Sequence, residues 1–315
     1  MDKMIITSSP HVRSNASVSR IMLDVVIALM PAAVAAVYYF KFQAAFLIAI
    51  AVATAVVTEA LIQWLLKRPV TVGDWSAVIT GLLVAFNLPP TAPWYIPFIG
   101  SIFAIVIVKQ VFGGLGHNFM NPAAAARVFL VASFGQQMTN WFNPAVDAVS
   151  NATPLAIVKG LSTDPLPPVT DMLLGNHGGC LGETCAIALL LGGVYLLARR
   201  VITWHIPVAF IGTVGVLTLV FGPDGLFTGN VVYHLLGGGL LLGAIFMATD
   251  YVTSPVTSKG RLIMGFGCGV IVVVIRLLGG MSEGVAFSII LMNVATPLID
   301  RWTRPRIYGE VKPNA

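Results

Sequence analysis

The composition of this chain is that of an integral membrane protein. Of its 315 residues, 57% are hydrophobic and only 10% are charged, whereas a soluble domain carries about 25% charged residues. The net charge of +5 does not indicate nucleic-acid binding, because the basic residues are scattered at the ends of apolar segments. We therefore expect contact with membrane lipid and no nucleic-acid partner.

Apolar segments of about twenty residues predict membrane-spanning helices. The polar stretch before Ile21 has no apolar core or cleavage site, so it is not expected to be a secretory signal. The ten expected helices are 21–40, 44–66, 76–89, 94–113, 121–136, 177–198, 201–222, 229–249, 261–280 and 284–301. The third is short and ends in Asn87-Leu88-Pro89-Pro90, which indicates a broken or re-entrant helix.

The ten helices divide five and five around a polar interval, which predicts an all-α fold of two inverted five-helix repeats. Gly81-Leu82-Leu83 precedes a Gly-Gly pair by 32 residues, and Gly239-Leu240-Leu241 precedes another by 40. The alternative is chance recurrence, since the chain is rich in Gly and Leu. The expected segments are an N-terminal segment 1–20, repeats 21–136 and 177–301, a loop 137–176 and a tail 302–315.

The basic residues predict the orientation of the chain in the membrane. With the N-terminus inside, fourteen Lys and Arg residues, Lys109 among them, fall on the inner side and three on the outer side. Arg127 falls within a span. We therefore expect both termini in the cytoplasm and the 137–176 loop on the opposite face.

Four ionisable residues fall at membrane depth or near its edge, namely Asp24, Glu59, Arg127 and Asp250. Such groups cost several kcal/mol unless they are paired or hydrated, which makes each a functional hypothesis. Asp24 and Asp250 lie near inner ends, where they could reach water. Glu59 and Arg127 are the better candidates for a buried polar path.

The three cysteines, Cys180, Cys185 and Cys268, are too few to bind an iron–sulfur cluster through four thiolates. Cys180 and Cys185 are close enough for a disulfide if their loop faces an oxidising compartment. The other interpretation is that they are small residues at a helix end. No metal site is expected, and no nucleophile–base pair or Gly-rich nucleotide loop indicates a catalytic residue.

Thr153 is the residue of the polar interval at which we expect chemistry. Its neighbours Ala148, Ser150 and Ala152 are small, so a bulky group on its hydroxyl would meet little steric resistance. Three other interpretations remain open: Asn151 to Thr153 as a glycosylation triplet, Thr153-Pro154 as a phosphorylation site, and Thr153 as the cap of a helix that begins with proline.

Several segments resemble one family of membrane proteins, which comprises the D subunit of Rnf electron-transport complexes and the B subunit of sodium-translocating NADH:quinone reductases. Asp147-Ala148-Val149-Ser150-Asn151-Ala152-Thr153 resembles the family's flavin-attachment motif, Ser/Thr-x-Ala-Thr with a preceding Asp. The other similar segments are Phe112 to Ala123 with its Gly-Gly-Leu-Gly and Asn-Pro-Ala, Gly182-Glu183-Thr184, Ala248 to Pro255, Gly279 to Gly284, and Met292-Asn293. The family commonly has Pro at Tyr251 and Tyr-Pro at Met281-Ser282, so partner contacts at those loops are expected to differ.

The resemblance implies FMN bound covalently through a phosphodiester to Thr153, with Ser150, Ala152 and Asp147 as motif residues and a flavin transferase as the attaching enzyme. It also implies a second, non-covalent flavin, riboflavin, which these residues do not place. The implied partners are the other Rnf subunits, in a complex of the bacterial cytoplasmic membrane that moves electrons between ferredoxin and NAD. That transfer would be coupled to Na⁺ or H⁺ transport.

A second region is expected to bind the ion or the second flavin, and its candidate residues are Asn118, Asn121, Asp250, Glu283, Asn293 and Glu59. Segments 118–122 and 283–293 each follow a Gly-Gly pair and are expected to be equivalent breaks, with a turn before a helix that starts at Pro122.

A near-copy of the attachment motif occurs at Thr296. It lacks the Ser or Thr and the Asp of the motif and falls in the last helix, so it is not expected to carry flavin. The alternative function is a channel or secondary transporter without a redox role, since the family's fold resembles that of urea channels.

Overall fold

The computed structural model describes residues 17–143, 148–150, 153–222, 225–227 and 229–305, and these are mostly helical. By length and composition, three helices can cross a membrane: α1 (Val18–Leu65), α12 (Ser258–Leu278) and α13 (Val285–Thr303). Shorter apolar helices are α2 (Ser76–Phe86), α3 (Tyr95–Phe103) with its π-helical continuation η2 (Ala104–Gln110), α4 (Pro122–Ser133), α8 (Ala186–Ala198) and α9 (His205–Val220). These elements make the chain a helical membrane protein.

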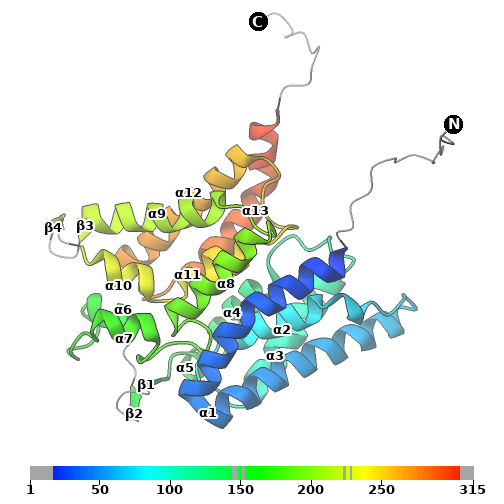
Figure 1. Ribbon diagram of the computed structural model, residues 1–315, viewed down its shortest axis with the longest axis horizontal. Coiled ribbons are helices and arrows are strands. Elements are labelled where there is room, and N and C mark those ends of the chain that lie inside the picture. Colours follow the sequence, from blue (N-terminus) through cyan, green and yellow to red (C-terminus); the bar gives the residue numbers. More distant parts are fainter. Residues whose placement is uncertain (1–16, 144–147, 151–152, 223–224, 228, 306–315) are drawn as a thin grey trace, which may run out of the picture.

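Helix α1 is two helices joined at Lys41, whose backbone has φ 53° and ψ −137°. Its two arms correspond to the predicted spans 21–40 and 44–66. Figure 1 shows the two arms of α1 meeting at an acute angle, so that the chain reverses direction between them. Helices α2 and α8 pack against α1.

The first half of the chain contains two breaks between apolar helices. Helix α2 ends at Phe86, shorter than the predicted span 76–89 and consistent with the expected break. Between η2 and α4, Gly113, Gly114 and Gly116 have φ between 92° and 124°, a region that favours glycine. Helix α4 then begins at Pro122, which confirms the predicted turn before it.

The second half departs from its predicted span 229–249, which is broken into three pieces. These are α10 (Val231–Leu236), α11 (Leu240–Leu242) and the π-helix η3 (Gly243–Met247). Gly238 and Gly239 at the break have φ 69° and 65°. The buried Arg276 of α12 donates to the carbonyl oxygens of His234 (2.5 Å), Gly237 (3.0 Å) and Gly238 (3.2 Å). It thereby satisfies groups that a break would leave unpaired in an apolar environment.

The predicted helix 177–198 is wrong in its first nine residues, because α8 begins only at Ala186. Residues 177–184 form a fully buried, irregular segment. Its backbone pairs with the end of α2, since the Leu181 and Gly182 amides donate to the carbonyls of Leu88 (2.9 Å) and Phe86 (3.0 Å). A Cβ on Gly182 would lie 2.2 Å from the Phe86 Cβ, so only glycine fits there.

The predicted loop 137–176 contains short elements of its own. Strand β1 (Trp141–Asn143) pairs antiparallel with β2 (Ala148–Ser150), with Trp141 opposite Ser150. Helices α5 (Gly135–Met138), α6 (Pro154–Val158) and α7 (Val169–Leu174) flank this hairpin. Elsewhere, the 3₁₀ turn η1 (Val72–Asp74) precedes α2, and strands β3 (Phe221–Gly222) and β4 (Gly225–Leu226) form a second hairpin.

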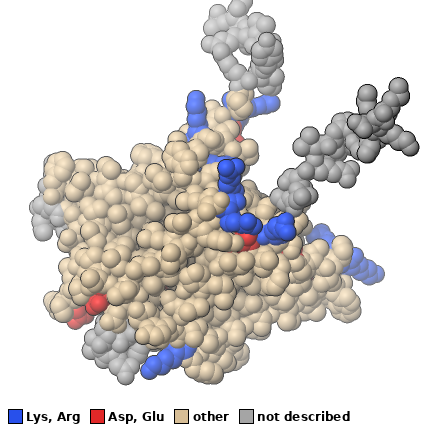
Figure 2. All heavy atoms as spheres, viewed as in Figure 1, with Lys and Arg blue, Asp and Glu red and all other residues tan. Residues whose placement is uncertain are grey.

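The core lies where the two halves meet, and α4 contacts both α2 and α13. Many large apolar side chains remain exposed, such as Val34, Val194 and Leu278, which fits a surface that faces lipid rather than water. Figure 2 shows a largely uncharged face, with most of the visible Lys and Arg side chains near the end that carries the start of α1. The short elements of 135–174 lie at the opposite end (Figure 1).

Candidate functional site

Thr153 is the N-cap of helix α6, and its hydroxyl oxygen accepts a hydrogen bond from the Ala156 amide at 3.3 Å. Pro154 occupies the first turn, so the helix-cap interpretation of Thr153-Pro154 is confirmed. The cap leaves the attachment hypothesis open, because a hydroxyl esterified to phosphate still has an oxygen that can accept this bond. Ser150 lies in β2, whereas Asp147 and Ala152 fall outside the described residues.

Thr153 is only 4% exposed, yet it lines a cavity of about 430 Å³, called here the Thr153 cavity. Small-molecule sites have volumes of roughly 300–1,000 Å³. The walls come from the end of α2, from α4, from residues 138–141 and 153–164, and from the break between α10 and α11. Met247 of η3, the loop 280–284 and the first turn of α13 complete them. The polar residues among them are Asn87, Arg127, Thr139, Thr153, Ser162, Asp164, Ser282 and Glu283.

Arg127 of α4 forms an ion pair with Glu283 at the wall of this cavity. The two side chains are 11% and 16% exposed. The guanidinium also donates to the Asn87 carbonyl at 2.5 Å and to the Cys180 sulfur at 2.9 Å. Arg127 therefore joins four separate parts of the chain and compensates the carbonyl freed where α2 ends.

Cys180, Glu183 and Glu283 place their ligand atoms within 4.8 Å of one another, a spacing that a metal ion could use. Arg127 contacts two of the three, and Glu183 accepts a hydrogen bond from the Cys180 amide at 2.9 Å. Because the guanidinium already supplies the positive charge, the arrangement favours a salt-bridge cluster over a metal site. Cys180 and Cys185 are free thiols, so the possible disulfide is not formed.

The loop that carries Glu283 is held next to α6 by Lys159. The Lys159 ammonium donates to the carbonyl of Gly279 and to that of Met281, the latter at 2.9 Å. Burial lowers the pKa of Lys159. The same short helix that begins at Thr153 thus fixes the position of the Glu283 loop.

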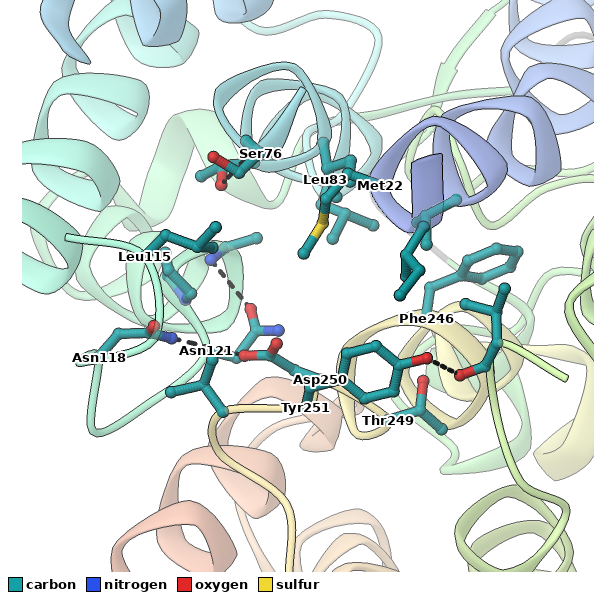
Figure 3. A pocket seen from close by; sticks show the side chains of 18 of the residues that line it. Met22, Ser76, Leu83, Leu115, Asn118, Asn121, Phe246, Thr249, Asp250 and Tyr251 are labelled. Carbon is teal, nitrogen blue, oxygen red and sulfur yellow. Dashed lines mark hydrogen bonds between the residues drawn. The ribbon is translucent and has the colours of Figure 1, made fainter. Parts of the chain in front are cut away.

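A second cavity, called here the Asp250 cavity, has a volume of about 100 Å³. The Asp250 carboxylate accepts hydrogen bonds from Asn118 (3.4 Å) and Thr253 (3.2 Å). Figure 3 shows Asn118, Asn121 and Asp250 together on one side of this cavity and Tyr251, which donates to the Val201 carbonyl, on another. Three of the predicted ion or second-flavin residues are therefore neighbours.

Asn121 and Met247 lie between the two cavities. Asn121 lines the Asp250 cavity and donates to the Met247 carbonyl at 3.1 Å, while Met247 lines the Thr153 cavity. Asn87 donates to the Met247 sulfur at 3.6 Å from the Thr153 side. These contacts therefore join residues that line the two cavities.

Asn293 lies inside α13, so the expectation of a break from 283 to 293 is wrong beyond Gly284. With its side-chain amide oriented to satisfy its hydrogen bonds, Asn293 accepts from the backbone N–H of Asn121 at 2.9 Å and donates to the Ile289 carbonyl at 3.2 Å. The two predicted residues do meet, but through a helical side chain. Thr296 also lies in α13, as expected, and its hydroxyl donates to the Thr253 and Met292 carbonyls.

Glu59 lines neither cavity, but it forms a buried ion pair at 2.7 Å with Lys109, which lines the Asp250 cavity. The Glu59 and Lys109 side chains are 1% and 3% exposed. Gln110 (3.0 Å) and Gln63 (3.3 Å) also donate to the Glu59 carboxylate, and Lys109 donates to Ser76 at 2.6 Å. Lys109 is therefore buried in η2. The prediction that counted it among the basic residues of the inner side is wrong for this residue. Asp24, by contrast, pairs with the half-exposed Arg199 at 3.2 Å.

Comparison with known proteins identifies the chain. The profile of the NQR2, RnfD, RnfE family matches residues 5–309. The chain belongs to this family. The segments that resemble the family's motifs lie at the two cavities. Segments 118–123 and 249–252 line the Asp250 cavity, and segment 280–284 lines the Thr153 cavity.

Relatives in the NQR2, RnfD, RnfE family match almost the whole chain. The chain is 52% identical over 312 residues to the D subunit of the Na⁺-translocating ferredoxin:NAD⁺ oxidoreductase complex of Acetobacterium woodii, covering 98% of this chain and 96% of the relative. It is 47% identical to the D subunit of the proton-translocating ferredoxin:NAD⁺ oxidoreductase complex of Clostridium ljungdahlii, covering 96% of each. It is 43% identical to the D subunit of an ion-translocating oxidoreductase complex of Stutzerimonas stutzeri, covering 93% and 92%.

Sequence reasoning missed the members of the site that depend on tertiary contact, namely Cys180, Glu183 as a cluster member, Lys109 as a partner of Glu59, and Arg276. The signal for Arg276 was available, because an arginine one turn from the end of an apolar helix marks a group that requires a partner.

Proposed function

We propose that this chain is the membrane flavoprotein subunit of an ion-translocating ferredoxin:NAD⁺ oxidoreductase complex, with FMN attached to Thr153. Its full-length similarity to the D subunits of such complexes supports the role in electron transfer. The observation that carries the assignment of the site is that Thr153, the last residue of the attachment motif, opens onto a cavity of about 430 Å³.

The residues around Thr153 fit a tethered flavin. The hydroxyl is fixed by its capping contact with Ala156, and Lys159 at the end of α6 is tied to the carbonyl of Met281, which also lines the cavity. A phosphodiester at this hydroxyl would anchor the phosphate end, leaving the ring system to lie among the polar and apolar walls. The bound FMN would supply the electron-accepting and electron-donating chemistry, and the protein would bind, orient and tune it.

The proposal extends to the ten-helix topology of two inverted repeats and to an extracytoplasmic Thr153 loop. The charge distribution supports this orientation, because thirteen of eighteen Lys and Arg residues, without the buried Lys109, fall on the side assigned to the cytoplasm. Partner subunits would exchange electrons with the FMN, and a flavin transferase would attach it. The transported ion would be Na⁺ or H⁺, since the names of the two relatives give different ions.

A channel or secondary transporter is the second candidate. Two cavities that are separated by the Asn121–Met247 contact would suit a transport path. Such a protein would have no need of a flavin on Thr153, so the attachment experiment distinguishes the two functions.

The experiment is co-expression of the full chain with a flavin transferase, followed by denaturing electrophoresis and ultraviolet illumination. Only a covalent flavin remains with the denatured band. Wild-type and Thr296→Ala chains should fluoresce, and Thr153→Ala should not. A fluorescent Thr153→Ala chain would contradict the assignment, and a dark wild-type chain would favour the transporter.

A further inference from the structure

We infer that Arg127 stabilises the reduced form of the flavin in the Thr153 cavity and that Glu283 restrains this contact. The inference rests on the proposed attachment of FMN to Thr153. It adds the group that sets the flavin's reduction potential, which neither the motif nor the relatives' names assign.

Arg127 is the one cationic side chain among the described residues that line the cavity. Asp164 and Glu283 are the acidic ones. The Arg127 and Glu283 side chains are 11% and 16% exposed, and both residues line the cavity. The guanidinium is therefore within the walls that would enclose a flavin carried by Thr153.

Reduction of a flavin changes its charge, and a nearby cation stabilises the negatively charged reduced form. A bound flavin would take up two electrons from partner electron carriers and one proton, which would bind at N5. One negative charge then remains on the N1 and C2 carbonyl edge. In a low-dielectric cavity an adjacent cation stabilises such an anion strongly. Arginine suits this edge because it stays protonated and presents two parallel N–H donors.

The contacts of Arg127 leave its guanidinium able to interact with a negatively charged flavin in the cavity. Arg127 contacts only one oxygen of the Glu283 carboxylate, and the other oxygen has no hydrogen-bond partner among the described residues. Arg276 is the structural contrast: it is 2% exposed, donates to three backbone carbonyls and does not line the cavity. Arg276 therefore has a structural role, whereas Arg127 pairs with Glu283 and also faces the space that a flavin would occupy.

The test is a spectroelectrochemical titration of the covalent FMN in the purified full-length chain, at equal FMN content by gel fluorescence. Removing a charge-assisted hydrogen bond should reduce the preference for the reduced flavin about tenfold to a hundredfold. For a two-electron couple this lowers the midpoint potential by about 30–60 mV in Arg127→Gln. Arg127→Lys keeps the charge and should shift less. Glu283→Gln frees the guanidinium and should raise the potential.

Arg199→Gln is the matched control, because it removes one positive charge from a residue that pairs with Asp24 and does not line the cavity. A fluorescent Arg127→Gln chain with a potential equal to that of Arg199→Gln overturns the inference and leaves the proposed function intact. If Arg127→Gln does not fold, an unchanged or lowered potential in Glu283→Gln overturns it equally. A wild-type chain without gel fluorescence contradicts the proposed function itself and this inference with it.

Discussion

The buried pair of Glu59 and Lys109 gives a prediction about stability whose size follows from its geometry. At 2.7 Å and an effective dielectric constant of about 20, the Coulomb attraction is about 6 kcal/mol, and desolvation of the two ions offsets much of it. Lys109→Met leaves the Glu59 carboxylate buried with only Gln63 and Gln110 as donors. We expect it to lower the free energy of unfolding by about 3–5 kcal/mol.

The double variant Glu59→Gln/Lys109→Met removes both charges and should cost only about 1–3 kcal/mol, the value of the lost hydrogen bonds. The assay is unfolding in mixed micelles followed by tryptophan fluorescence, analysed as a double-mutant cycle. Arg199→Gln, which breaks a half-exposed pair with Asp24, is the control and should change stability little. The reasoning is refuted if the double variant loses as much as the sum of the single ones, or if Lys109→Met matches the control.

Three further predictions follow from local contacts. Gly182→Ala places a Cβ 2.2 Å from that of Phe86 and should cost about 1–3 kcal/mol by overpacking, measured in the same assay; unchanged stability would mean the buried segment is free to move. Asn121→Leu removes a side-chain cap of α4, worth about 0.5–2 kcal/mol, and should impair ion coupling in the assembled complex while gel fluorescence persists; full coupled activity would show that the contact is only structural. Single cysteines at Gln137 and Ser258, in a chain without its native three, should react with an impermeant thiol reagent at 137 but not at 258 in intact cells, and the reverse pattern would invert the orientation.

The parts of the fold that could be predicted were those governed by local sequence. A proline fixes the start of α4, and helices α2, α9, α12 and α13 lie close to the bounds expected from their apolar stretches. The cap at Thr153 follows from the same local chemistry, because Thr followed by Pro suits a helix start.

The parts that failed depend on contacts between distant segments. Residues 177–185 are mostly small and directly precede an apolar stretch. The Leu181 and Gly182 amides nevertheless pair with the end of α2, which is about ninety residues earlier in the chain. Lys109 resembles a loop residue until Glu59 is placed beside it, and Arg127 meets Glu283 across 156 positions of sequence. Hydrophobicity and spacing carry no information about such pairings, so the charge cluster beside the Thr153 cavity emerges only from the fold.

The most direct test of the proposed flavin site is mass spectrometry of the proteolysed chain, isolated from a membrane that contains its flavin transferase. The peptide that contains Thr153 should carry the mass of one FMN less one water, fragmentation should place it on the Thr153 hydroxyl, and the peptide that contains Thr296 should be unmodified. An unmodified Thr153 peptide, or FMN on any other residue, would contradict the assignment.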